Sequence, residues 1–105
     1  MDNVSPKKRV FDTHAVALKY TPSEGDDAPR VVAKGKGHIA ERLKEIARQN
    51  DIRIHEDPEL VRLLSAVEVE SEIPYALFAA VAEVLALIYR ADEDKRKAAM
   101  GDAAR

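Results

Sequence analysis

The sequence contains no cysteine among its 105 residues. It therefore excludes a disulfide framework and a thiolate zinc site, and this composition suits a reducing compartment. The first nine residues also lack the apolar stretch that a secretory signal requires, because they combine polar groups with a short basic run. We therefore expect a cytoplasmic protein.

The sequence also lacks a large excess of charge of either sign. Seventeen basic and 19 acidic residues give a formal net charge of -2, and the 34% of charged residues are mixed in sign. Such a chain has no broad field that would attract nucleic acid or an anionic membrane. Aromatic residues are scarce as well, since two phenylalanines and three tyrosines are all that could stack on bases. A nucleic-acid-binding domain is thus an alternative with little support.

The hydrophobic content of 46% is enough for one domain with one core at this length. Residues 1–9 have too little apolar surface to order themselves, so we expect a flexible N-terminal tail there. Residues 91–105 are charged and rich in alanine, which predicts a flexible or frayed helical tail. The folded domain is expected over residues 10–90.

The segment 15–20 has apolar residues on both alternating faces, which is typical of an interior strand covered on both sides. A connection rich in proline, glycine and acidic residues follows over 21–29 and predicts a loop. Residues 31–34 form a second apolar run and predict a buried strand. Val10 and Phe11 are expected to add a short edge strand.

Apolar residues at helical spacing predict an amphipathic helix over 38–49, with Asn50 and Asp51 as its stop signal. Residues 52–55 then alternate apolar with polar, as a strand does. Strand, helix and strand in this order predict a βαβ unit, whose strands 31–34 and 52–55 would be parallel. The expected apolar face of the helix consists of Ile39, Leu43, Ile46 and Ala47.

Asp57 as N-cap and Pro58 at the first helical position predict a second helix over 58–68. A last helix is expected over 74–90, and its apolar residues are spread around its circumference. The helix thus has more apolar surface than one core-facing side requires, which has three interpretations. It is a membrane span, a helix packed deep in the core, or a helix whose second apolar face binds a partner. Glu83 near the middle argues against the span. The predicted fold is therefore α/β, a small mixed sheet of three or four strands with a βαβ unit, surrounded by three to four helices.

Candidate chemistry is weak throughout the chain. Residues 34–38 lie between a strand and a helix N-terminus and could hold a phosphate, but they match no known phosphate loop, so a turn that needs glycine is favoured. Asp12, Thr13 and His14 have no recognisable oxyanion stabiliser. His14, His38 and His55 lie on separate elements without a second ligand nearby. We expect no catalytic, cofactor-binding or metal-binding site.

Several segments together resemble one known family. Thr13-His14 is followed by Ala-Val-Ala-Leu-Lys-Tyr, and Ala28-Pro29 is followed by Val-Val-Ala-Lys-Gly at 31–35. Further matches lie at 42–47, at 60–64 with 67–69, and at 72–74 with 80–86. These residues resemble the cytoplasmic domain of the flagellar and type III secretion export switch proteins. The resemblance implies a small α/β domain with a mixed sheet wrapped by helices, here in a free-standing form without the family's membrane domain.

Members of that family cut their own backbone between the Asn and Pro of an Asn-Pro-Thr-His motif. In this sequence the motif is degenerate. Two alignments are possible, and they place Val10-Phe11 or Phe11-Asp12 at the Asn-Pro positions, so neither of them restores asparagine and proline. We therefore expect no self-cleavage, with a self-cleaving switch as the alternative. The degenerate region consists of Val10, Phe11, Asp12, Thr13 and His14.

The resemblance implies a non-catalytic interaction module of the export apparatus that contributes to substrate recognition or specificity switching. Export substrates, export-gate components and a membrane-anchored paralogue are the expected partners, the location is the cytoplasm or the inner-membrane export apparatus, and a monomer is expected. The last helix places Phe78, Ala82 and Leu85 on one stripe, while Pro29 stiffens the end of a loop. The predicted partner-binding residues are Ala28, Pro29, Phe78, Ala82 and Leu85, unless Leu85 belongs to the core and Ala28-Pro29 is an idle turn.

Overall fold

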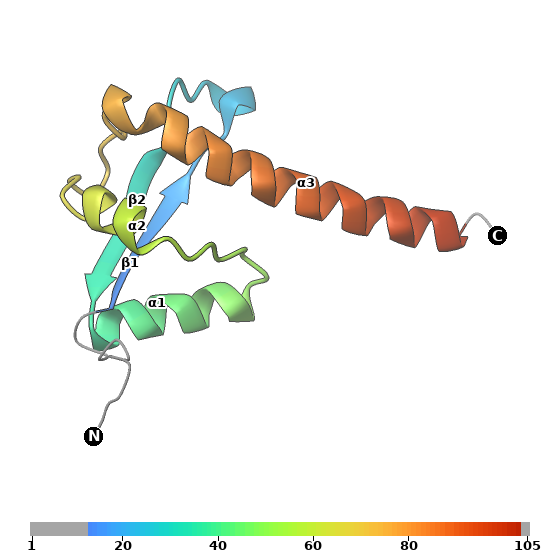
Figure 1. Cartoon of the computed structure of the whole chain (residues 1–105), viewed down its shortest axis with the longest axis horizontal. Helices are drawn as coiled ribbons and strands as arrows, with labels where there is room; N and C mark the ends of the chain where they lie inside the picture. Colours follow the sequence, from blue (N-terminus) through green and yellow to red (C-terminus); the bar gives the residue numbers. More distant parts are fainter. Residues whose placement is uncertain (1–12, 104–105) are drawn as a thin grey trace. The chain divides into compact units, whose positions relative to one another are not determined.

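A computed structural model describes the backbone of residues 13–103 and the side chains of residues 13–91 (Figure 1). The chain divides into two compact units, Met1–Pro74 and Tyr75–Arg105. In the first unit lie β1 (His14–Lys19), the 3-10 turn η2 (Pro22–Glu24), β2 (Arg30–Lys36), α1 (His38–Gln49) and α2 (Pro58–Leu64). In the second unit lie the 3-10 turn η3 (Tyr75–Leu77) and α3 (Phe78–Ala103). This is a mixed α/β fold with two antiparallel strands and three α-helices in the described part of the chain.

The two strands form an antiparallel hairpin, and both predicted strands are confirmed with small changes of their ends. His14 pairs with Lys36, and the register holds to Ala17 opposite Ala33. It then shifts, because Leu18 pairs with Val31 and leaves Val32 as an extra residue on β2. Such a bulge bends the strand and increases its local twist.

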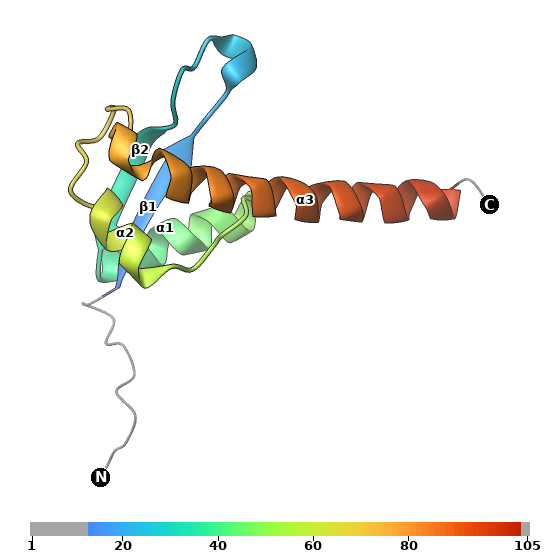
Figure 2. The same ribbon diagram turned by 45° about the horizontal axis from the view of Figure 1, so that its top comes forward.

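The two faces of the hairpin are covered by different helices of the first unit (Figure 2). On one face, a Cβ at Gly35 would lie 2.3 Å from Ile39 Cγ2, so α1 packs directly on this strand position. On the other face, Lys34 Nζ reaches the carbonyl oxygens of Ser65 and Val67 just beyond α2. Because successive residues of a strand point to opposite faces, these contacts place α1 and α2 on opposite sides of the sheet.

The core of the first unit is small and aliphatic. Its most buried side chain is Val31 on β2, which is fully inaccessible, as is Ala40 on α1. The remaining buried apolar residues of this unit are Ala28, Leu60, Leu64 and Ile73.

Helix α1 has the predicted bounds, but its apolar face is rotated from the expected one. Ala40 is fully buried, whereas Ile39 is 63% exposed and Ile46 39% exposed. The reason lies in the sheet, because the small side chain of Ala40 permits close approach of the helix to the strands, which a larger residue would prevent.

The prediction of a third strand at 52–55, and with it the parallel βαβ unit, is wrong. At the end of α1, Asp51 adopts a left-handed conformation with φ of 57°, and Ile52 N donates to Ala47 O over 2.8 Å. This is a Schellman motif, which reverses the chain after the helix. The chain continues through 52–56 as an exposed segment without strand pairing in the described structure.

A different segment extends the sheet instead. Glu72 forms an antiparallel bridge with Arg30, and Ile73 N donates to Pro29 O over 2.9 Å. Val31 completes the contact, since its N donates to Ser71 O and its O accepts from Glu70 N. The outer edge of β2 is therefore occupied at its start by residues 70–73, which follow α2 and precede η3.

Helix α2 begins as predicted and ends earlier than predicted. Leu60 N donates to the N-cap carboxylate of Asp57 over 3.1 Å, and Pro58 occupies the first turn. The helix ends at Leu64 rather than at 68, because i→i+3 bonds replace the α-helical ones: Ala66 N donates to Leu63 O and Val67 N to Leu64 O.

Helix α3 begins at Phe78 rather than at 74 and continues to Ala103, through most of the segment predicted as a flexible or frayed helical tail. Val81 is 1% exposed and lies at the centre of a stripe of half-buried apolar residues. The half-buried members of this stripe are Phe78, Val84, Leu85 and Ile88. The predicted N-terminal tail and the predicted edge strand at Val10-Phe11 lie outside the described residues.

Candidate interaction surface

The first half of the predicted docking surface lies at the end of the hairpin loop. Ala28 is 3% exposed and Pro29 is buried, so both side chains contribute to the core rather than to the surface. The backbone is also fixed there, because Pro29 O accepts a hydrogen bond from Ile73 N. Pro29 is therefore the last residue of the loop that joins the two strands. Within this loop, the Asp26 carboxylate accepts a hydrogen bond from Thr21 N over 2.8 Å.

The second half lies on the first turns of α3. Ala82 is exposed, while Phe78 and Leu85 are half-buried beside the buried Val81. The ring of Phe78 packs on that of Tyr75, with centroids 5.2 Å apart and planes tilted by 53°. Phe78, Ala82 and Leu85 thus form a solvent-accessible apolar stripe on α3, next to the buried face of the helix. Leu85 is half-buried, so it contributes both to this stripe and to the buried face.

The two halves belong to different compact units, the first unit for Ala28 and Pro29 and the second for the α3 stripe. That a partner binds these five residues stays a prediction.

The glycine-rich segment after β2 is a structural turn. Gly37 has φ of 64° and ψ of -128°, a conformation that is accessible to glycine and strained for other residues. Its N donates to Thr13 O over 2.8 Å and its O accepts from Glu41 N, so it joins the sheet to the first turn of α1. These bonds give the glycine a structural role in the turn.

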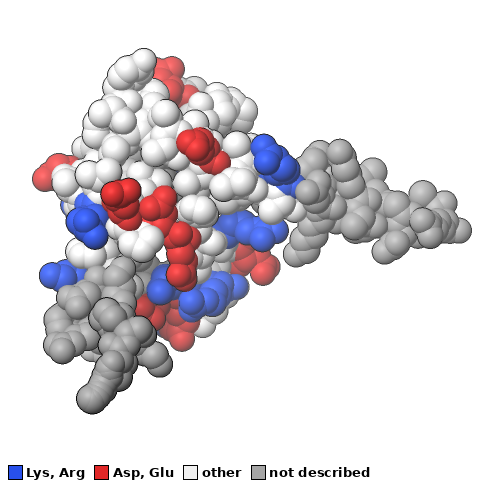
Figure 3. All heavy atoms as spheres, in the orientation of Figure 1, with Lys and Arg blue, Asp and Glu red and all other residues white. Residues whose placement is uncertain are grey.

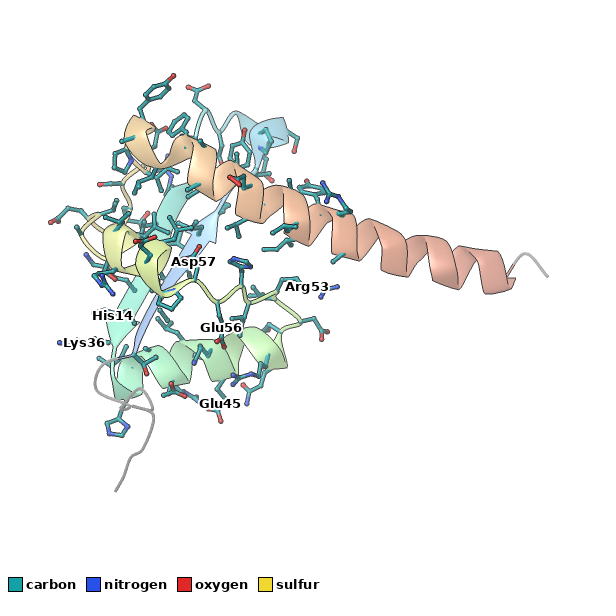
Figure 4. The ribbon with its side chains drawn as sticks, viewed as in Figure 1. His14, Lys36, Glu45, Arg53, Glu56 and Asp57 are labelled. Atoms are coloured by element: carbon teal, nitrogen blue, oxygen red, sulfur yellow. The ribbon has the colours of Figure 1, made fainter. Side chains whose placement is uncertain are left out.

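His14, at the end of the degenerate cleavage region, has a side-chain contact that bears on chemistry. Its Nδ1 lies 3.5 Å from Ser65 Oγ, at the limit of a hydrogen bond, and Figure 4 shows His14 on β1. The Ser65 hydroxyl donates to Val61 O over 2.7 Å, which directs its proton to the helix backbone. This geometry does not activate the serine as a nucleophile. Val10, Phe11 and Asp12 lie outside the described residues.

No cluster of three or more potential metal ligands occurs within the described part of the chain. Likewise, no helix among the described residues is long and apolar enough to cross a membrane. On the face drawn in Figure 3, several acidic side chains form a short run near the middle and basic side chains lie on both sides of it.

Lys34 is a residue whose importance the sequence analysis missed. Its ammonium group donates to Ser65 O over 3.0 Å and to Val67 O over 2.8 Å, so one side chain on β2 holds the chain that leaves α2. A lysine in the middle of an apolar strand is an available signal, since such a charge requires partners when it is partly buried.

Comparisons with known proteins relate this chain to a single protein family. The family model described as the FlhB HrpN YscU SpaS family matches residues 12–88. The protein YlqH of Bacillus subtilis is 44% identical over 79 residues, covering 75% of this chain and 84% of its own. The flagellar biosynthetic protein FlhB of Aquifex aeolicus is 53% identical over 88 residues, covering 79% of this chain. The match spans only 25% of that FlhB.

Solved structures agree with the sequence matches. The cytoplasmic domain of FlhB from Shewanella putrefaciens superposes with a TM-score of 0.67 at 39% identity, covering 72% of this chain and 61% of that one. The PscU C-terminal domain gives a TM-score of 0.67 at 32% identity, covering 71% of this chain and 95% of that one.

Proposed function

Because the chain belongs to the FlhB HrpN YscU SpaS family, we propose that it is a non-catalytic interaction module of the flagellar or type III protein export apparatus. In this role it acts in the cytoplasm or at the inner-membrane export apparatus and helps to choose or time the substrates that are exported. Its partners are export substrates, components of the export gate and a membrane-anchored paralogue whose cytoplasmic part it replaces or complements.

The observation that carries this proposal is the apolar stripe on α3. Ala82 is exposed between the half-buried Phe78 and Leu85, so a small residue leaves a shallow apolar surface beside two larger side chains. A short apolar segment of a substrate fits such a surface with modest affinity, because little area is buried and few polar groups are desolvated. Modest affinity suits a substrate that must be released for transport.

Ala82→Asp tests the stripe, since it places a charge at its centre without removing a core side chain. Binding to an early export substrate or to the export-gate ring protein, measured by isothermal titration calorimetry, should weaken by about tenfold or more, because a desolvated apolar contact is replaced by a charge. Circular dichroism should show an unchanged helix content.

Ala80→Asp is the matched control. Ala80 is also exposed on α3, and it lies two residues away, or about 160° around the helix axis. This variant should bind like the parent. Equal affinity of all three proteins would contradict the proposed surface, and unfolding of Ala82→Asp alone would assign this position to the core.

The non-catalytic part of the proposal concerns self-cleavage. Cleavage in the family depends on an asparagine side chain at the motif, and the sequence has Val10-Phe11 or Phe11-Asp12 at that place. The purified protein, held at mildly alkaline pH, should therefore give one intact mass by mass spectrometry. A spontaneous break between residues 9 and 15 would refute this part and restore the self-cleaving alternative.

A further inference from the structure

Helix α1 carries an apolar stripe that is largely accessible to solvent. Ile39, Leu43 and Ile46 recur at the spacing i, i+4 and i+7, so they share one side of the helix. Ile39 is 63% exposed and Ile46 39% exposed, while Leu43 is half-buried. The cause is the rotation of the helix, because the small Ala40 is fully buried in place of these larger side chains. We call Ile39, Leu43 and Ile46 the α1 stripe.

The apolar surface continues past the end of the helix. The Schellman motif at Asp51 returns the chain to the last turn of α1, where Ile52 N donates to Ala47 O. Ile52 is 59% exposed. Exposed apolar surface that is rimmed by polar residues, here Arg42 and Glu45, is typical of an interaction site.

The chain itself supplies a segment that begins beside this stripe. Residues 1–12 lie outside the described structure, and Thr13, which follows them, is bonded to the start of α1. Its O accepts from Gly37 N over 2.8 Å, and Gly37 is the N-cap of the helix, two residues before Ile39. Twelve extended residues span up to about 40 Å, whereas a 12-residue helix is roughly 18 Å long. Residues 1–12 can therefore reach every part of the α1 stripe.

The register of the hairpin indicates which residue of this segment points toward α1. Ala15 pairs with Gly35, and Gly35 is the position on which Ile39 packs. Side chains alternate between the two faces of a strand, so the face of Ala15 is the face that α1 covers. A strand continued back by four residues would place position 11 on this same face. That position is Phe11, the one aromatic residue of the segment, and Val10 precedes it.

We propose that Val10 and Phe11 dock on the α1 stripe of the same chain, with the Phe11 ring against Ile39. Docking removes an aromatic ring and aliphatic side chains from water on both surfaces. The covalent connection favours this occupant, because Phe11 is only two residues from Thr13 and its effective concentration at the stripe is therefore high. A second copy or a separate peptide would instead lose its freedom of motion for a contact of a few side chains.

This inference goes beyond the proposed function, whose surface lies on α3. It gives Val10 and Phe11, which belong to the degenerate cleavage region, a structural role on α1.

The absence of cysteine permits a test by disulfide trapping. Phe11→Cys combined with Ile39→Cys should form an intramolecular disulfide on mild oxidation, seen as a faster-migrating monomer in a non-reducing gel, because docking brings the two positions into disulfide range. The matched control combines Phe11→Cys with Leu63→Cys. Leu63 is 52% exposed on α2, on the other side of the sheet. It is also within reach of the segment, since His14 Nδ1 lies 3.5 Å from Ser65 Oγ.

The link between positions 11 and 39 should form faster than that between 11 and 63 by about tenfold or more. Equal rates would overturn the proposal. A second copy as the occupant would also overturn it, and this case is recognised by a disulfide-linked dimer that forms faster from the single variant Ile39→Cys than from Leu63→Cys.

The parent protein provides a measurement that does not depend on how the cysteine variants fold. NMR spectra should show nuclear Overhauser contacts between the Phe11 ring and the Ile39 methyl groups. Phe11→Ala should shift the Ile39 methyl resonances, because the ring current is removed, and should leave those of Leu63 in place. Absence of the contacts, or equal shifts at Ile39 and Leu63, would contradict docking on the α1 stripe.

Discussion

Removing the charge of Lys34 should destabilise the first unit more than its position on a partly exposed strand suggests. The substitution Lys34→Met keeps the apolar stem of the side chain and deletes the ammonium group. The carbonyl oxygens of Ser65 and Val67 then lose a charged donor at 3.0 and 2.8 Å. A hydrogen bond to a charged group contributes roughly 1.5–3 kcal/mol, and partial access of water to the two carbonyls keeps the total loss near this range.

The assay is urea unfolding followed by far-UV circular dichroism. With a slope of about 1–1.5 kcal/mol/M for a chain of this size, the loss corresponds to a midpoint lower by about 1 M or more. Lys36→Met is the matched control, because Lys36 is exposed, lies on the same strand and points to the same face as Lys34. Its free energy of unfolding should stay within about 0.5 kcal/mol of that of the parent.

Equal midpoints for Lys34→Met and Lys36→Met would refute the reasoning. The two lysines would then be equivalent surface charges, and the turn after α2 would have to be held by other contacts. A further readout separates these cases, since amide exchange around Val67 should accelerate in Lys34→Met if the ammonium group fixes this turn.

Two further predictions concern the ends of helices. Gly37→Ala should lower the free energy of unfolding by about 1–3 kcal/mol in the same urea assay, because φ of 64° with ψ of -128° is strained for alanine; an unchanged midpoint would mean that this turn adopts another conformation. Asp57→Ala should cost about 1 kcal/mol by removing the acceptor for Leu60 N, whereas Asp57→Asn should retain most of the stability, since an amide oxygen also caps a helix. Equal losses for the two Asp57 variants would contradict the capping role.

Local features were the part of the fold that the sequence determined. The bounds of α1, the N-cap at Asp57 and the glycine requirement at 37 depend on interactions within a few residues, and these interactions are encoded by residue type and spacing. The hairpin strands were also predictable, because apolar residues on both faces require cover on both sides.

The candidate surface was predictable to a lesser extent. Helical spacing alone placed Phe78, Ala82 and Leu85 on one stripe, and the structure adds that Ala82 is exposed while its neighbours are half-buried. Spacing could not show that Ala28 and Pro29 are buried, since burial depends on which distant segment packs there.

Competition between distant segments is what only the tertiary structure decided. Residues 52–55 and 70–73 are both able to extend a sheet, and the alternation at Ile52 and Ile54 favoured the first of them. The structure pairs 70–73 with β2, because the Schellman motif at Asp51 turns the chain aside after α1 and Ile73 fills the core. Strand pairing joins residues that are far apart in the sequence. Its outcome therefore depends on the path of the whole chain, which no local sequence pattern determines.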